Sequence, residues 1–440
     1  MLRAFTIQNY RSILETKVAL DYAEGKAPPH GETVETLPFL KDGDGVDNRV
    51  VPILAVYGAN ASGKSNLVSA FKAFQTLLCN GVEGVYQPNK LNRRFDMGRF
   101  CTEAALPDGT RCLYEIAYNE REIASETLVR RGVDGGADET VFRLSNGADG
   151  DGKPVRDFAG VVTENYPAKR LAEAARVECS DVAGRLRRPF LWCLVHSYGG
   201  LLPLAVALWN EVVAKVNVFF GNEFFVSQGI DLLAGEDTDA ARQRALGEIL
   251  ALLRKFDFGI QHLSLLRQKV TMKRGEYPHA PKGAIFCQRE NDAVFDQITS
   301  RHVDADGNIV PFNFMTEESD GTKVIAGLLG ICLWAMKNGR TIVVDELDRS
   351  LHPLVLVALV SLFKSRRYNV ANGQLVFTLH DPTLLDESMM RISEVGIVDK
   401  TLKDGTTVRR LSDYDGVRNV VNFRRQYLGG AYHGIPFPYI

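Results

Sequence analysis

The chain has 440 residues, more than one ordinary globular domain contains, so two or three structural units or one large domain with insertions are expected. Its composition, 45% hydrophobic and 24% charged, excludes wholesale disorder and a fibrous repeat. A net charge of −2 argues against a uniformly basic nucleic-acid-binding surface, although local basic patches are compatible with it.

The N-terminal part predicts a strand, a glycine-rich loop and a helix. Residues 2–8 roughly alternate apolar and polar side chains, as an edge-type strand does, and lack the apolar core of a secretory signal. Residues 21–49 are rich in Gly, Pro, Asp and Glu, which is typical of a long surface loop or insertion. The apolar run 50–57 fits a strand buried on both faces. The chain then turns through 58–65, and 66–78 has the apolar spacing of a helix.

The middle of the chain predicts strands, then helices, then strands again. Turn signals separate three short strands, at 111–118, 123–130 and 140–144. Residues 165–256 have helical spacing, with apolar faces on 201–219 and 238–256, and no heptad persists that would predict a long coiled coil. Residues 260–315 return to strand-like alternation.

Two features predict a cytoplasmic protein without a membrane segment. The stretch 190–209 has no Asp, Glu, Lys or Arg and is long enough to span a bilayer. It carries His196 and a Gly-Gly-Leu-Leu-Pro turn near its middle, so two short buried segments are the better interpretation. The seven cysteines include no Cys-x-x-Cys pair, so we expect neither a disulfide framework nor a zinc knuckle, and a reducing cytoplasm fits best.

The C-terminal part predicts alternating helices and strands. A buried apolar helix is expected at 324–336, followed by a core strand at 341–345 and a helix at 353–366. Further strands are expected at 374–378 and 394–399.

The strongest motif is Gly58-Ala-Asn-Ala-Ser-Gly-Lys-Ser65, which matches G-x-x-x-x-G-K-[ST] between a buried strand and a helix. Loop N–H groups and the helix N-terminus can cradle phosphate oxygens, and glycine lets the backbone approach closely. Lys64 would place a positive charge between the β- and γ-phosphates, and the Ser65 hydroxyl would ligate Mg²⁺. The context disfavours a chance match. The predicted nucleotide-binding residues of the loop are Gly58, Asn60, Ala61, Ser62, Gly63, Lys64, Ser65 and Asn66.

A second motif, Thr341-Ile-Val-Val-Asp-Glu346, is an apolar strand that ends in two carboxylates. Asp345 can hold Mg²⁺ through its hydration shell, and Glu346 can orient and deprotonate the attacking water. By itself the pattern also fits a strand that runs into an acidic turn, but the phosphate-binding loop upstream favours the catalytic interpretation.

Two weaker signals lie on either side of this strand. Ser319 and Gly321 precede the buried helix and can form an anion-binding turn at its N-terminus, although spacing alone favours a simple helix cap. His380 follows the strand 374–378, where it can hydrogen-bond the γ-phosphate. A lone histidine is more often structural, so these two signals depend on the first two motifs.

Taken in order, these motifs resemble the ABC-type ATPase heads of the SMC, Rad50, RecF and OLD group. The Walker A motif is 58–65, and the Walker B motif with the catalytic glutamate is 343–346. The stretch 349–352 falls at the D-loop and His380 at the switch histidine. Ser319-Asp-Gly321 falls at the signature motif, although it departs from the usual Leu-Ser-Gly-Gly-Gln.

The N-terminal Asn9-Tyr-Arg-Ser12 is similar to the start of these heads, where the arginine approaches the nucleotide. The resemblance therefore implies nucleotide contacts for Arg11 and Ser12. The glutamine loop of the group is not clearly readable. Gln87 is the only nearby candidate, and an ordinary loop residue is the better interpretation of it.

The resemblance is closer still to standalone bacterial AAA-15/AAA-21-type ATPases, the RloA-like group of phage-defence systems. It is specific over 1–75 and 312–440 and rests on four stretches: Gly58–Asn66, Glu318–Thr322, Asp345–Pro353 and Tyr427–Pro436. It implies an α/β fold, an ABC-type P-loop NTPase head with a mixed sheet, flanking helices, an antiparallel β-lobe and a helical insertion. The expected domains are an N-terminal lobe at 1–75, a β-lobe at 76–160, a helical insertion at 161–260 and a C-terminal lobe at 261–440.

In ABC-type heads the signature serine and glycine of one subunit close on the ATP of another. The resemblance thus implies a homodimer or higher homo-oligomer with ATP between heads, with Ser319 and Gly321 facing a neighbour's nucleotide. The implied cofactors are ATP and Mg²⁺.

Two functions from different classes are compatible with such a head. The first is the ATPase subunit of a bacterial anti-phage defence system, a sensor or scaffold that controls a separate nuclease or toxin effector, often a TOPRIM-type nuclease. The alternative is a RecF-like DNA-repair ATPase that clamps DNA. Basic clusters permit it, although solvated faces are their usual explanation: Arg93-Arg94, 185–188, 364–367 and Arg424-Arg425. An ABC transporter ATPase is disfavoured by the Asn-Tyr-Arg-Ser start and the Asp-Gly-Thr signature.

The C-terminal tail is a candidate contact surface for that effector. It mixes arginines with aromatic residues, a composition favoured at interface centres. Packing of the tail on its own ATPase core is an equal alternative. The aromatic residues are Tyr414, Phe423, Tyr427, Tyr432, Phe437 and Tyr439.

Overall fold

A computed structural model of the chain describes residues 1–22, 35–36, 49–132, 136–148, 154–159, 177–181, 185–197, 202–220, 226–271, 285–289, 292–386, 388–417 and 422–435. Most of the loop predicted at 21–49 lies outside these residues, as do 161–176 of the expected insertion and Phe437 and Tyr439 of the tail. The chain divides into two compact units. Unit 1 comprises Met1–Phe220, Gly339–Glu346 and Asn372–Ile440, and unit 2 comprises Gly221–Asn338 and Leu347–Ala371.

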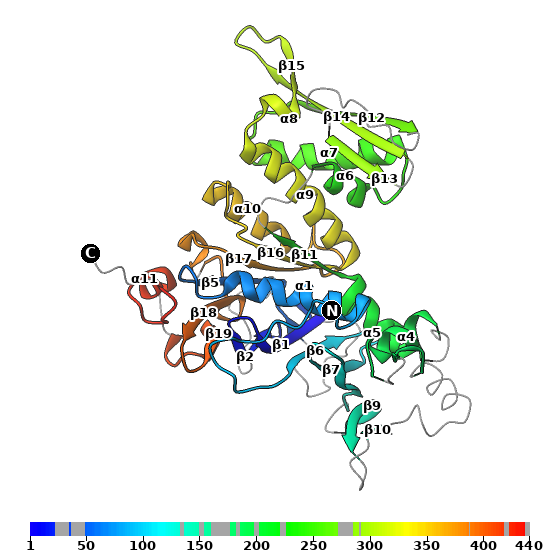
Figure 1. Ribbon diagram of the computed structural model, residues 1–440. Coiled ribbons are helices and arrows are strands. Elements are labelled where there is room, and N and C mark those ends of the chain that lie inside the picture. The colour runs from blue at the N-terminus through cyan, green and yellow to red at the C-terminus, as the bar shows by residue number, and fades with distance from the viewer. Residues whose placement is uncertain are drawn as a thin grey trace. The chain divides into compact units, whose positions relative to one another are not determined.

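In the described part of unit 1, thirteen strands form one mixed sheet in the order β10-β9-β8-β7-β6-β1-β2-β19-β18-β5-β17-β16-β11 (Figure 1). The last five strands of this order are parallel to one another. β5, β16 and β17 are buried along their whole length, which explains why β5 and β16 are continuous apolar runs. The parallel strands are Val395–Thr401 (β18), Ile53–Gly58 (β5), Gln374–Thr378 (β17), Thr341–Asp345 (β16) and Val216–Phe220 (β11).

The rest of this sheet is antiparallel and contains the predicted β-lobe. Its core is aromatic: the ring of Phe100 lies 5.6 Å from Phe5 and 5.4 Å from Tyr118. The α/β class with a mixed sheet and an antiparallel lobe is thereby confirmed. The antiparallel strands are Leu2–Tyr10 (β1), Ile13–Ala19 (β2), Gly98–Ala105 (β6), Arg111–Tyr118 (β7), Ile123–Arg130 (β8), Glu139–Ala148 (β9), Pro154–Ala159 (β10) and Gly405–Arg410 (β19). A separate short pair is formed by Glu35–Thr36 (β3) and Arg49–Val50 (β4).

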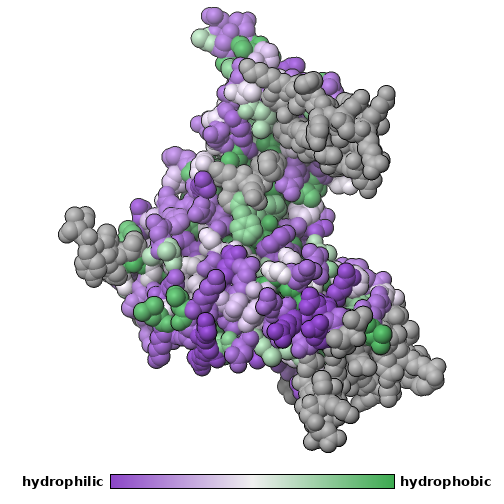
Figure 2. Space-filling model, viewed as in Figure 1, coloured by the Kyte–Doolittle hydropathy of each residue, from purple (hydrophilic) through white to green (hydrophobic). Residues whose placement is uncertain are grey.

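Helices flank the sheet of unit 1. Lys64–Asn80 (α1) follows the glycine-rich loop, and its apolar residues join the same core as the sheet. The stretch 190–209 forms two short helices, Phe190–His196 (α4) and Pro203–Trp209 (α5). Among the described residues, no helix has the length and apolar character needed to cross a membrane. The face in Figure 2 is mainly hydrophilic where the chain is described.

Two local features of unit 1 differ from the expectation. Residues 216–220, predicted to be largely helical, form β11, because their β-branched and aromatic side chains suit a strand and the edge of β16 pairs with their backbone. Cys179 and Cys193 are joined by a disulfide, although no disulfide framework was expected. An isolated bridge between Ser180 and Leu186 folds this segment back and brings the two cysteines together.

Unit 2 combines helices with a small antiparallel sheet. Val226–Ala234 (α6), Asp239–Lys255 (α7) and Asp320–Asn338 (α9) pack on one another. Gly229 and Gly330 permit the close approach of α6 and α9, because a Cβ on Gly330 would lie 2.7 Å from the Gly229 backbone. The remaining elements are His262–Thr271 (β12), Ile285–Arg289 (β13), Asp292–Val303 (β14), Ile309–Asn313 (β15), Phe314–Glu317 (α8) and Pro353–Phe363 (α10).

The compact units therefore divide the chain differently from the domains expected from the resemblance. The strands between 262 and 313, expected in the C-terminal lobe, form their own sheet in unit 2. The expected insertion at 161–260 instead contributes β11 to the large sheet of unit 1. Sequence periodicity identifies strands, but strand pairing decides to which sheet each belongs.

The C-terminal tail packs on its own unit over the described residues. Phe423 and Tyr427 belong to Phe423–Leu428 (α11), and both are buried, as is Tyr432. The ring of Tyr427 lies 5.7 Å from Tyr57 at the end of β5. The tail thus packs against β5 of the same chain through Tyr427, which favours the second of the two interpretations of the tail, packing on its own core.

Candidate nucleotide site

The loop between β5 and α1 has a backbone that only certain residues allow. Gly63 has φ +108°, and Ala61 also lies in the left-handed region at +63°. A Cβ on Gly63 would lie 2.2 Å from the Thr406 hydroxyl, and a Cβ on Gly58 would lie 2.7 Å from the Val398 carbonyl. Both glycines of the motif are thus required by close contacts with the C-terminal strands β18 and β19, and Gly63 is also required by its backbone conformation.

This loop lines a pocket of about 370 Å³ together with three predicted residues from distant parts of the chain. Asp345 ends β16, Glu346 follows it, and His380 lies just beyond β17. All belong to unit 1. The complete lining is Ala59, Asn60, Ala61, Ser62, Gly63, Lys64, Ser65, Asn66, Asp345, Glu346 and His380. The structure therefore brings the Walker A loop, both carboxylates and the switch histidine to one place.

Lys64 is held close to the loop that precedes it. Its side chain is buried, and Nζ donates to the carbonyl oxygens of Gly58 at 2.6 Å and Ala59 at 3.1 Å. These bonds keep a cation among backbone groups at the start of α1, where loop N–H groups and the helix dipole also favour an anion. The arrangement is suited to phosphate oxygens.

The two carboxylate residues are held by Thr378, the last residue of β17. Its hydroxyl donates to Asp345 Oδ1 at 2.6 Å and accepts a hydrogen bond from the Glu346 N–H at 2.8 Å. Glu346 has φ +53°, so the chain leaves the strand direction at this residue. Sequence reasoning missed Thr378. Its only signal was a hydroxyl residue at the end of a core strand, two positions before His380.

Ser65 and Asp345 could hold a magnesium ion in this pocket. Both offer oxygen atoms, which Mg²⁺ prefers, and Asp345 Oδ2 receives no hydrogen bond from the described residues. Among those residues, no group of three or more His, Cys, Asp or Glu side chains could hold a metal by itself.

Arg11 and Ser12 lie on the turn between β1 and β2, next to the loop. The Ser12 hydroxyl accepts a hydrogen bond from Asn66 Nδ2 at 2.7 Å and lies 2.8 Å from the Thr406 hydroxyl. Thr406 also bonds the carbonyl of Ser62 at 2.7 Å, so it joins this turn to the phosphate loop. Thr406 was not predicted, because nothing in its local sequence distinguishes it.

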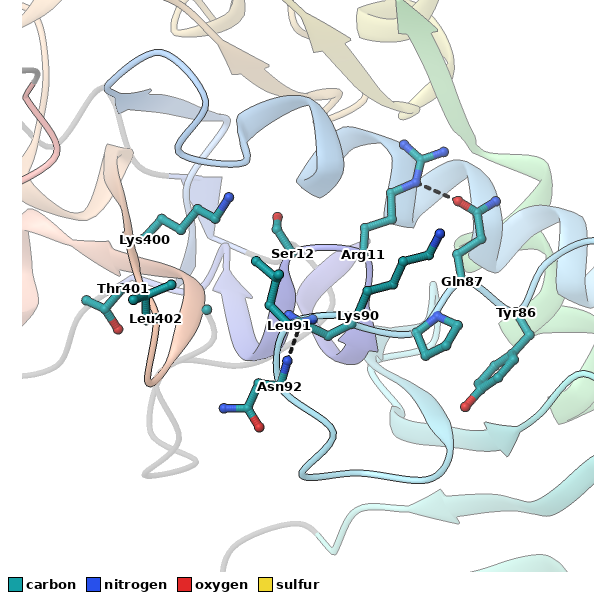
Figure 3. A pocket seen from close by; sticks show the side chains of 13 residues that line it. Arg11, Ser12, Tyr86, Gln87, Lys90, Leu91, Asn92, Lys400, Thr401 and Leu402 are labelled. Carbon is teal, nitrogen blue, oxygen red and sulfur yellow. Dashed lines mark hydrogen bonds between the residues drawn. The ribbon is translucent and has the colours of Figure 1, made fainter.

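Gln87, interpreted from the sequence as an ordinary loop residue, contacts Arg11 directly. Arg11 Nε donates to Gln87 Oε1 at 2.6 Å (Figure 3). The Arg11 backbone N–H also donates to the Gln87 carbonyl oxygen at 2.7 Å. Arg11 also donates to the Ser69 hydroxyl on α1 at 3.0 Å.

A second pocket, of about 720 Å³, opens beside Arg11 and Ser12 (Figure 3). One wall is the loop 86–92, and another is the tip of the β18–β19 hairpin. Leu91 and Leu402, one from each wall, are exposed apolar side chains. Lys90 and Lys400 add positive charge.

Ser319 and Gly321 belong to unit 2, whereas the residues that line the phosphate pocket belong to unit 1. The Ser319 hydroxyl accepts a hydrogen bond from the Thr322 N–H at 3.1 Å and so caps α9. A Cβ on Gly321 would lie 3.0 Å from the carbonyl of Ser350 in the predicted D-loop. The signature turn thus lies against the D-loop. The Ser319 side chain also forms the simple helix cap that the sequence spacing favours.

Residues 209–386 match the sequence profile of a family described as "AAA domain, putative AbiEii toxin, Type IV TA system". No curated protein matches the chain. The SMC head domain from Thermotoga maritima is 11% identical and has a TM-score of 0.38, covering 93% of this chain and 98% of that chain. The recombination mediator protein RecF, in a structure titled RecF-ATPrS, is 11% identical with a TM-score of 0.33, and coverage is again 93% and 98%.

The likeness to both solved structures is weak, and the assignment rests on the family match and the geometry. The matched region contains the signature turn, the Walker B strand and His380. The Walker A loop precedes it and shares one pocket with Asp345, Glu346 and His380. The chain is a nucleotide-binding ATPase with an ABC-type P-loop head.

Proposed function

We propose that the chain hydrolyses ATP in the 370 Å³ pocket as the ATPase subunit of a bacterial anti-phage defence system, where its nucleotide state controls a separate effector. The observation that carries the hydrolytic part is the single pocket shared by the phosphate loop, two carboxylates and a histidine. The defence role is supported by the resemblance of the four motif stretches to those of RloA-like ATPases. The description of the matching family also names a toxin of a toxin–antitoxin system.

Each residue of the pocket has a defined part in this proposal. Lys64 exchanges its carbonyl partners for the β- and γ-phosphates of ATP. Ser65 and Asp345 hold Mg²⁺, which neutralises charge on the phosphates when it is bound. Glu346 accepts a proton from the attacking water, and His380 donates a hydrogen bond to the γ-phosphate.

The nucleoside part of ATP is proposed to lie in the 720 Å³ pocket beside Ser12. Ser12 lines this pocket and is hydrogen-bonded to Asn66 and Thr406, so the pocket lies next to the phosphate loop. Leu91 and Leu402 offer apolar surface to a base, and Arg11 offers charge on the side toward α1 (Figure 3).

Completion of the site is proposed to need a second copy of the chain. Ser319 caps α9, a helix of 19 residues whose N-terminus favours an anion. In the proposed dimer this turn faces the γ-phosphate bound to the partner's loop. Closure on ATP and opening after hydrolysis would then transmit the nucleotide state to the effector.

Plaque assays test the defence role. Cells that carry the chain together with its neighbouring genes should restrict phage, and cells that carry either alone should not. The purified chain should degrade neither DNA nor RNA. Nuclease activity that is lost on mutation outside the ATP site would contradict the need for a separate effector.

A RecF-like DNA-repair ATPase is the second candidate, because unit 2 carries a cationic surface. Lys255 Nζ donates to the Tyr368 hydroxyl at 2.6 Å, and the Arg367 guanidinium lies 5.7 Å from the same ring. If this surface binds DNA, replacing Lys255 and Arg367 by alanine weakens DNA binding and lowers its salt dependence. The control is Lys337→Ala, which removes a cation paired with Glu248 and leaves DNA binding unchanged. Unchanged DNA binding in the double variant would exclude this surface.

A further inference from the structure

Thr378 joins the two acidic residues of the phosphate pocket, and no motif accounts for it. Its side chain is 1% exposed. A hydroxyl carries one proton and two lone pairs. Here the proton goes to Asp345 Oδ1 at 2.6 Å, and a lone pair receives the Glu346 N–H at 2.8 Å. One side chain thus contacts both residues that the proposed hydrolysis needs.

The sheet explains how Thr378 reaches both neighbours. β16 and β17 are parallel with Val344 opposite Phe377, so Asp345 and Thr378 are the next pair at the carboxyl ends of their strands. Glu346 has left the ladder with φ +53°, and the Thr378 hydroxyl takes the hydrogen bond from its N–H.

We propose that Thr378 is a positioning residue that sets the orientation of both carboxylates for ATP hydrolysis. By occupying Asp345 Oδ1 it fixes the rotamer of this side chain and leaves Oδ2 for Mg²⁺ or its water. By holding the Glu346 peptide in the left-handed region it fixes the point from which the general base projects. This proposal rests on the proposed ATP hydrolysis.

The alternative is that Thr378 only satisfies buried polar groups and contributes to stability. The two roles differ in what they change. A structural role lowers the melting temperature but leaves turnover per folded molecule and the Mg²⁺ dependence as they are. A positioning role changes both, because misplacement of a reacting group by about 1 Å can cost about 100-fold in rate.

The test compares three variants of the full chain in steady-state ATPase assays with Mg²⁺ titrated at fixed ATP. Thr378→Val keeps the shape and removes the hydroxyl, and Thr378→Ser keeps the hydroxyl. Thr341→Val is the matched control, because Thr341 lies at the other end of β16, is also buried, and bonds Gln374 of β17 at 3.1 Å. Binding of a fluorescent ATP analogue without Mg²⁺, together with thermal unfolding, reports whether each variant is folded.

We expect Thr378→Val to lower kcat by about 10- to 100-fold and to raise the Mg²⁺ concentration for half-maximal rate, with analogue binding within about twofold of wild type. Thr378→Ser should restore most of the activity, and Thr341→Val should match wild type. A Thr378→Val enzyme with wild-type kcat and Mg²⁺ dependence overturns the proposal.

If Thr378→Val does not fold, Thr378→Ser decides, because loss of its turnover at an unchanged melting temperature contradicts the role of the hydroxyl. Absence of ATP hydrolysis in the wild-type chain would instead refute the proposed function itself.

Discussion

Replacement of Gly63 by alanine adds only one methyl group, but it should destabilise the phosphate loop strongly. Gly63 has φ +108°, a conformation that L residues rarely adopt, and the new Cβ would lie 2.2 Å from the Thr406 hydroxyl. The backbone strain costs about 1–3 kcal/mol. Displacement of Thr406 adds about 1–2 kcal/mol through its bonds to Ser62 and Ser12. The total is roughly 2–5 kcal/mol in the free energy of unfolding.

Gly84→Ala separates the two contributions. Gly84 also has positive φ, at +71°, but no atom lies within 4 Å of the position of its Cβ. Its replacement should therefore show the backbone cost alone, about 1–2 kcal/mol. For a unit of this size, each kcal/mol lowers the melting temperature by about 2–4 °C. Gly63→Ala should also lose binding of a fluorescent ATP analogue, whereas Gly84→Ala should keep it.

The double variant Gly63→Ala with Thr406→Ala completes the measurement. Removing the Thr406 side chain relieves the clash, so it should recover part of the stability that Gly63→Ala alone loses. Thermal unfolding monitored by circular dichroism gives the melting temperatures. Equal melting temperatures for Gly63→Ala and Gly84→Ala, with unchanged analogue binding, would refute the reasoning from the Thr406 contact.

Three further predictions concern chemistry, assembly and pH. Lys64→Ala should weaken ATP binding, whereas Glu346→Gln should keep binding and lose about 10²- to 10⁴-fold in turnover, and full turnover in Glu346→Gln would reject its role as base. Ser319→Arg should bind ATP without hydrolysing it. Mixing this variant with Lys64→Ala should restore activity, because each mixed dimer then has one shared site with an intact Lys64 and an intact Ser319. Absence of recovery in a mixed dimer would contradict a site shared between subunits. Burial raises the pKa of Glu126 to about 7, so the stability it contributes is present at about pH 4 and is lost as the pH rises through 7. Chemical unfolding across this range should show the loss in wild type and not in Glu126→Leu.

Much of the local structure could be predicted because its signals are local. The strands 111–118 and 123–130 have the predicted bounds, since turn residues flank each one. The strand 341–345 also has the predicted bounds, as a buried apolar run that ends in carboxylates. The phosphate loop was readable for the same reason, because its glycines, lysine and serine lie within eight consecutive residues.

The parts that could not be predicted depend on partners far along the chain. Thr378 is recognisable only beside Asp345, and Thr406 only beside Gly63 and Ser12. Gln87 is distinguished from other loop residues only by its hydrogen bond with Arg11.

The nucleotide loop and the carboxylate pair could thus be recognised from the sequence, since each is encoded in a short contiguous run. That residues 216–220 form a strand depends on the tertiary structure, because pairing with β16 outweighs the local helical pattern. It also decided which hydroxyls hold the site. Hydrogen bonds between neighbouring strands are set by register, and register is a property of the folded sheet.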